Sequence, residues 1–168
     1  MASLTNAFNQ NMLDRIMPPF GTKRANIPVW NEGQKMFIIS EYESATGHLY
    51  YRGVRFCDRI VISEKVGLYY NWTYIDAIEL YVFNGTRLEL VQTREYTKEF
   101  RDEALIRRDS ETMVKNYLNG VVKSQGLNMS SQLIEVQARE LVEGCYKSFL
   151  DADYNTRLMQ ILPAIEQR

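Results

Sequence analysis

The sequence predicts an α+β fold in which an antiparallel sheet of five to six strands comes first and helices follow. Residues 35–96 form short runs rich in aromatic and β-branched residues, separated by turn signals. Residues 97–168 instead repeat apolar residues at helical spacing, and the two patterns do not mix. Strands followed by helices are typical of helices packed on an antiparallel sheet, so we expect a single domain over 35–168.

Residues 1–34 precede the predicted sheet and are expected to form a helix followed by an extended arm. An apolar stripe recurs at every fourth position: Leu4, Phe8, Met12 and Ile16. This spacing predicts an amphipathic helix over 3–17. The helix is expected to end before Pro18, because a proline disfavours helical geometry in the preceding residue. The helix could pack on its own domain or on a neighbouring subunit, and the sequence leaves both interpretations open.

The predicted strands form a meander of closely spaced runs: 36–43, 48–56, 59–63, 68–74, 77–83 and 86–93. Residues 64–67 are expected to form a turn. Asn84-Gly85 predicts a hairpin with a type I′ turn, in which both central residues need positive φ. Alternation along the runs gives one apolar and one mixed face, as in a sheet covered on one side. The meander could stay open or curl into a small barrel.

The helical part is expected to hold three to four helices. Local signals mark their ends: a start at Thr97, an interruption at Asp109-Ser110, an end at Gly126, a cap at Ser130 and a short last helix after Asn155. Glycine just beyond a helix and serine just before one are the usual end signals.

The composition argues against several classes of protein. The net charge is −1, and neither the strand half nor the helical half is strongly basic, as a nucleic-acid module would be. No apolar run is long enough to span a membrane, and no signal peptide is recognisable at the start of the chain. We therefore expect a cytoplasmic protein or a member of a large soluble assembly. The two cysteines, Cys57 and Cys145, are expected to be reduced and buried.

No motif predicts catalysis, a metal site or a cofactor. Residues 151–155 begin like a calcium loop, but Thr156 and Leu162 stand where that loop needs glycine and glutamate. The single histidine, His48, lies roughly opposite Glu43 if the first hairpin closes around 44–47, and such a pair could act as a general base. We interpret His48 as a solvated strand end, because no nucleophile signature accompanies it.

We expect a non-catalytic assembly subunit that binds other protein subunits in a ring, shell or connector. Three features favour this function: few candidate catalytic residues, an N-terminal arm that could reach a neighbour, and abundant Tyr, Met and Trp, which are common in interfaces. The expected arm contacts are Leu4, Phe8, Met12, Phe20 and Trp30. A second surface, on the sheet, is expected to include Tyr50, Tyr51, Arg52, Arg55, Tyr69 and Tyr70. The alternative is a nucleic-acid or small-ligand module, because tyrosines with basic neighbours can stack bases.

Overall fold

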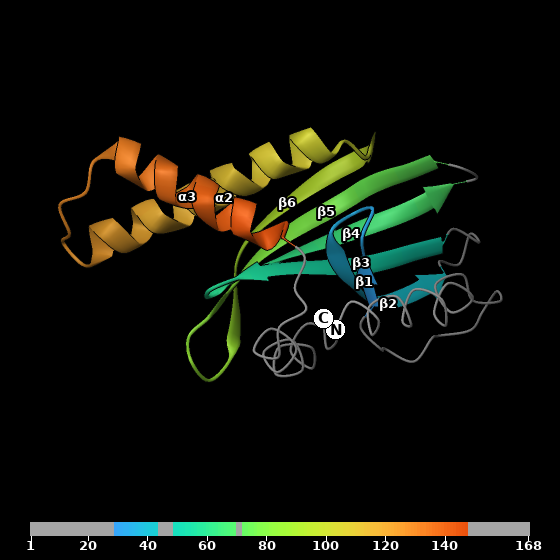
Figure 1. Cartoon of the computed structure of the whole chain (residues 1–168), viewed down its shortest axis with the longest axis horizontal. Coiled ribbons are helices and arrows are strands. Elements are labelled where there is room, and N and C mark those ends of the chain that lie inside the picture. Colours follow the sequence, from blue (N-terminus) through green and yellow to red (C-terminus); the bar gives the residue numbers. More distant parts are fainter. Residues whose placement is uncertain (1–28, 44–48, 70–71, 148–168) are drawn as a thin grey trace.

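The computed structural model describes residues 29–43, 49–69 and 72–147, which form six strands and two helices (Figure 1). The strands are β1 (Val29–Asn31), β2 (Met36–Glu43), β3 (Leu49–Cys57), β4 (Ile60–Tyr69), β5 (Trp72–Phe83) and β6 (Leu88–Phe100). The helices are α2 (Glu103–Ser124) and α3 (Ser131–Cys145). The predicted α+β class and its order, sheet first and helices after, are confirmed.

The strands pair with their neighbours in chain order, and every pairing is antiparallel. β1 and β6 are the two edges, so the described meander is an open sheet rather than a barrel. Figure 1 shows α2 and α3 side by side on one side of the sheet. We call that side the helix face and the opposite side the far face.

Both faces of the sheet carry apolar clusters. The helix-face cluster joins strand residues to helix residues such as Ile106, Met113 and Val142. The far-face cluster contains only strand residues: Phe37, Ile39, Val54, Phe56, Val61, Tyr81 and Leu88. The expectation of one apolar face was therefore wrong, since successive residues in β2 and β3 supply apolar side chains to both sides.

β4 runs without a break through residues 64–67, where a turn was expected. The turn-like residues there have other roles. Glu64 is held inside the strand by ion pairs with two arginines. At Gly67, an added Cβ would lie 2.2 Å from Cζ of Tyr74, so glycine leaves room for that ring. Of residues 68–74, predicted as one strand, 68–69 belong to β4 and 72–74 to β5.

Three boundaries differ from the prediction. Val29–Asn31 lies in the expected arm but pairs with β2, so the sheet begins before residue 35. β6 continues to Phe100, and the first described helix begins at Glu103 rather than at Thr97. α2 is not interrupted at Asp109-Ser110, and the buried Ser110 hydroxyl is satisfied inside the helix by donating to the Ile106 carbonyl. The described residues hold two of the expected three to four helices, and residues 3–17 and those after Asn155 lie outside them.

The local end signals were mostly correct. Gly126 has φ +65° just beyond α2, and the Ser130 side chain caps α3 by accepting from the Leu133 N–H. Asn84-Gly85 lies in the β5–β6 hairpin as predicted, but the turn is not type I′. Gly85 has positive φ, Asn84 does not, and the Asn84 side chain instead accepts from the Arg87 N–H.

Candidate functional site

The predicted sheet-face residues are divided between the two faces. Tyr51 and Arg55 lie on the helix face, where Tyr51 belongs to the core and Arg55 contacts Tyr146 beyond the end of α3. Tyr50 and Arg52 alternate with them and therefore lie on the far face. Tyr51 and Arg55 therefore share the helix face, and Tyr50 and Arg52 share the far face. The four residues do not form one surface.

A buried ionic cluster occupies the helix face. Glu64 of β4 is fully buried and Arg55 of β3 is 1% exposed, and the Arg55 guanidinium donates to the Glu64 carboxylate. Arg101, just after β6, lies against the same carboxylate, with Nε 3.0 Å from Oε1 and Nη2 3.3 Å from Oε2. One carboxylate therefore joins β3, β4 and the end of β6.

The remaining N–H groups of Arg55 fasten the β1–β2 turn to the sheet. Its Nε donates to the Lys35 carbonyl over 2.9 Å and its Nη2 donates to the Gln34 carbonyl over 2.6 Å. The Gln34 side chain in turn donates to the Tyr51 hydroxyl. Arg55 thus has partners on three sides, which leaves its guanidinium little capacity for a ligand.

Tyr146 connects the ionic cluster to α3. Cζ of Arg55 lies 4.0 Å from the centre of the Tyr146 ring, and Cζ of Arg107 in α2 lies 4.3 Å from the same ring. Arginine over an aromatic ring is attracted by the charge distribution of the ring. These contacts link both helices to the sheet.

The titration of the cluster follows from its burial and charges. Burial alone would raise the pKa of Glu64, but the charges and hydrogen bonds of Arg55 and Arg101 hold that pKa below its usual value. Burial raises the pKa of Tyr51 to about 12, and it also raises the pKa of Tyr146. The carboxylate is therefore ionised and both tyrosines are neutral at ordinary pH, so the cluster offers neither a general base nor an activated nucleophile.

An aromatic row crosses the far face at one end of the sheet. In the strand register, Tyr50 lies opposite Gly67, Gly67 opposite Tyr74, and Tyr74 opposite Phe100. The Tyr50 and Tyr74 rings meet edge to face with their centres 6.0 Å apart. Trp72, two residues before Tyr74 in β5, extends the row on the same face.

Two members of the aromatic row are open to solvent. The exposed fractions are 66% for Trp72 and 69% for Phe100, the largest among the exposed large hydrophobic side chains of the described residues. Exposed Trp and Phe are enriched where proteins bind each other. The corner was not predicted, because residues 68–74 were expected to form one strand, whereas β4 ends at Tyr69 and β5 begins at Trp72. The proximity of Trp72 to Phe100 depends on the pairing of β5 with β6.

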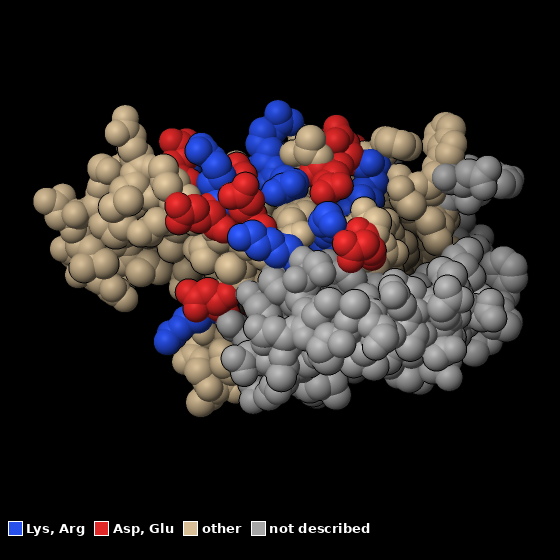
Figure 2. All heavy atoms as spheres, viewed as in Figure 1, with Lys and Arg blue, Asp and Glu red and all other residues tan. Residues whose placement is uncertain are grey.

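An arginine and a glutamate form an ion pair on the far face, beside the aromatic row. Arg52 Nη1 lies 3.2 Å from Glu79 Oε1, and both side chains are mostly buried. On the side of the molecule that Figure 2 presents, basic and acidic side chains of the described residues are interleaved. A single-stranded nucleic acid requires a positively charged groove beside its stacking rings, and Arg52 is already paired with Glu79 beside this row.

The other predicted contact residues have limited structural descriptions. Trp30 lies in β1 opposite Phe37, and Tyr69 lies in β4 opposite Trp72. Outside the described residues lie Leu4, Phe8, Met12, Phe20, His48 and Tyr70. The prediction of arm contacts and the His48 alternative therefore stay predictions.

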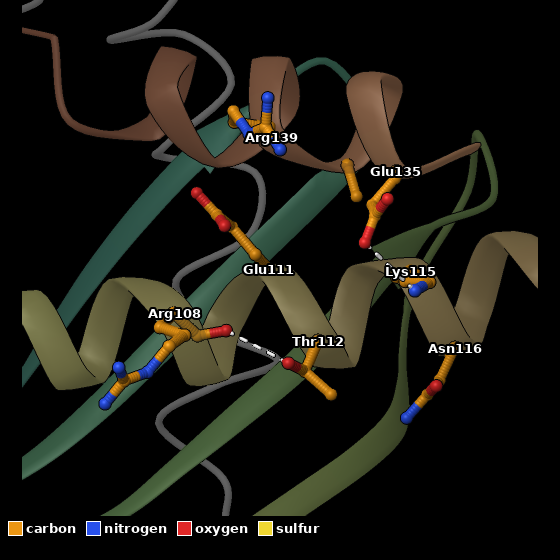
Figure 3. Close-up of a pocket in the computed structure, with 8 residues that line it drawn as sticks. Arg108, Glu111, Thr112, Lys115, Asn116, Glu135 and Arg139 are labelled. Carbon is orange, nitrogen blue, oxygen red and sulfur yellow. Dashed lines mark hydrogen bonds and ion pairs between the residues drawn. The ribbon is translucent and has the colours of Figure 1, made fainter. Parts of the chain in front are cut away.

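A groove of about 250 Å³ lies between α2 and α3. Lys115 Nζ and Glu135 Oε1 form an ion pair of 3.3 Å across it (Figure 3). Arg108 and Glu111 also line it but point in different directions, so its polar groups do not converge on one ligand. Within the described ranges, no group of three side chains is suited to holding a metal ion, and neither helix is long and apolar enough to cross a membrane.

Comparison with protein families, with curated proteins and with solved structures finds no match.

Proposed function

We propose that the protein is a non-catalytic assembly subunit that binds other protein subunits in a larger complex of the ring, shell or connector type. The observation that carries the proposal is the exposed corner formed by Trp72 and Phe100 on neighbouring strands. A tryptophan anchor beside a second ring is typical of the centre of a protein interface. The N-terminal arm would supply further contacts.

The alternative function, binding of nucleic acid or a small ligand on the sheet, has less support. The aromatic row offers stacking surfaces, but Arg52 is paired with Glu79 and Arg55 with Glu64. Neither arginine is placed to meet a phosphate while these pairs hold. A protein partner needs no excess of positive charge.

The test combines size-exclusion chromatography with light scattering, at low and high salt, while absorbance reports any bound nucleic acid. The test variant carries Trp72→Ser and Phe100→Ser, and the matched control carries Leu133→Ser, which removes an exposed apolar side chain from α3. We expect a discrete wild-type oligomer free of nucleic acid, dissociation of the double variant and an unchanged control.

Other outcomes would favour other functions. A salt-sensitive excess of nucleic acid on the wild-type protein would support the alternative. A wild-type monomer would exclude self-assembly at the concentrations tested. Capture of partner subunits by wild type and equally by the double variant would exclude the aromatic corner as the interface.

A further inference from the structure

The two cysteines of the chain lie on the helix face, where the end of β3 meets the end of α3. Cys57 is the last residue of β3 and Cys145 is the last residue of α3. Cys145 belongs to the helix-face cluster, and Cys57 packs against that cluster. Both are present as thiols rather than as a disulfide. The fold therefore gathers into one cluster two thiols that are far apart in the sequence.

The Cys57 sulfur touches the helix backbone one residue before Cys145. A Cβ added at Gly144 would lie 2.5 Å from Cys57 Sγ, so glycine leaves room for the sulfur at this point. Consecutive Cα atoms are about 3.8 Å apart, which places the Cys145 Cα within about 8 Å of that sulfur. On the other side of Cys145, the Tyr146 ring contacts Arg55, which lies two residues before Cys57 in β3 and on the same face. Cys145 therefore lies between two residues that β3 contacts directly.

The two thiols differ in their access to solvent. Cys145 has no exposed surface, whereas Cys57 is only partly buried. An oxidant that arrives from solvent therefore meets Cys57 first. An accessible thiol with a second, resolving thiol beside it is the usual arrangement of a reversible redox site. The contact of Cys57 with Gly144 places the second thiol on the same turn of α3.

We propose that Cys57 and Cys145 form a reversible disulfide when hydrogen peroxide reaches the protein, and that this bond fastens the end of α3 to β3. The Cys57 thiolate attacks one peroxide oxygen, the O–O bond breaks, and hydroxide leaves while Cys57 becomes a sulfenic acid. The Cys145 sulfur then attacks the Cys57 sulfur, the S–O bond breaks, and a second hydroxide leaves. Each hydroxide takes up the proton of one thiol. Two thiols are thus oxidised to a disulfide, and one peroxide is reduced to two molecules of water.

The disulfide would join two elements that the reduced protein holds together by packing and by the contact of Arg55 with Tyr146. β3 lies inside the sheet, between β2 and β4, so the end of α3 would be fixed to a strand that is itself paired on both sides. A disulfide spans Cα atoms about 4.4–6.8 Å apart, and the glycine at residue 144 lets the helix come close to the strand. Because the bond closes a long loop, it also restricts the unfolded chain, and the oxidised protein should resist urea better.

Oxidation of the full chain with dilute hydrogen peroxide tests the proposal. Peptide mapping of the unreduced protein should find Cys57 joined to Cys145 within one chain, and dithiothreitol should restore both thiols. The control variant carries Cys57→Ala and Arg59→Cys, which moves the accessible thiol to an exposed position between β3 and β4. Wild type should form its disulfide about tenfold faster than the control or more, because the contact raises the effective concentration of the two sulfurs.

Urea denaturation measures the consequence of the bond. Peroxide should raise the urea midpoint of wild type and dithiothreitol should lower it again, whereas Cys57→Ala, which also accounts for oxidised methionines, should show no rise. An unchanged wild-type midpoint would overturn the fastening of α3. The site itself would be overturned by equal rates for wild type and control, by a disulfide between two chains, or by sulfinic acid at Cys57 with Cys145 still a thiol. The light-scattering test of the Trp72 and Phe100 corner uses reduced protein, so it does not depend on these results.

Discussion

At the scale of single residues, Glu64 has the largest structural consequence. Its carboxylate contacts both Arg55 and Arg101, and the residue has no exposed surface. A buried ion pair is not in itself strong evidence of stability, because removing both charges from water is costly. Removing one partner alone is different, since it leaves the other charges buried without compensation.

The variant Glu64→Gln should therefore lower the free energy of unfolding by about 3–5 kcal/mol near neutral pH. Glu135→Gln is the matched control, because it removes the same charge from the exposed Lys115–Glu135 pair and should cost about 0–1 kcal/mol. Urea denaturation of the three proteins measures both differences. Equal costs for the two variants would show that the buried cluster does not support the fold.

The lowered pKa of Glu64 also predicts how the stability difference between wild type and Glu64→Gln depends on pH. The folded pKa of Glu64 lies below its unfolded value of 4.5, so the stabilisation is present above that value and is lost as pH falls through the folded pKa. The difference between wild type and Glu64→Gln should be largest near pH 7 and shrink below about pH 4. A difference that stays constant down to acid pH would contradict this assignment.

At the scale of elements, features set by a few adjacent residues could be predicted from the sequence. Features set by contacts between residues distant in sequence could not. The cap at Ser130 and the stop at Gly126 depend on the chemistry of a few adjacent residues, so the sequence alone indicates them. The course of β4 was predicted incorrectly because residues 64–67, which include Glu64 and Gly67, were interpreted as a turn. Their true roles depend on Arg101 and Tyr74, which are distant in sequence or lie on another strand.

The candidate site could be predicted from the sequence only in part. Arg52 and Arg55 are separated by an odd number of positions in one strand, so alternation alone would have placed them on opposite faces. The exposed pair of Trp72 and Phe100 could not be assembled from the sequence in the same way. Their proximity requires the register of β5 with β6, which contains a bulge between Ile75 and Ala77.

The cap of α3 gives a prediction at this scale. Ser130→Ala removes the oxygen that accepts from the Leu133 N–H at 3.2 Å and should cost about 1 kcal/mol of stability. Ser131→Ala is the control, because Ser131 is an exposed residue inside the first turn, and its effect should stay within about 0.5 kcal/mol. Urea midpoints compare the two, and a larger loss for Ser131→Ala would place the cap one residue later.

At the scale of the whole molecule, the sheet has two apolar faces but the described helices cover one. The helix face is closed by α2 and α3 and fastened by the Arg55–Glu64–Arg101 cluster. The far face has the buried far-face cluster at one end and the solvent-exposed aromatic corner at the other. We therefore expect these two ends to act differently, the far-face cluster in stabilising the fold and the corner in binding a partner.

Deletion of residues 1–28, which keeps β1 in the sheet, tests this division. If these residues contribute to the burial of the far-face cluster, their loss should lower the urea midpoint and increase the fluorescence of a dye that binds exposed apolar surface. Each fully buried Leu, Phe or Met contributes about 1.5–3 kcal/mol, so the change should be large. Phe8→Asp should act in the same direction, whereas Gln10→Asp, on the opposite side of the predicted helix, should have little effect. A shortened protein as stable and as free of dye as the full chain would mean that residues 1–28 do not contribute to the burial of the far-face cluster.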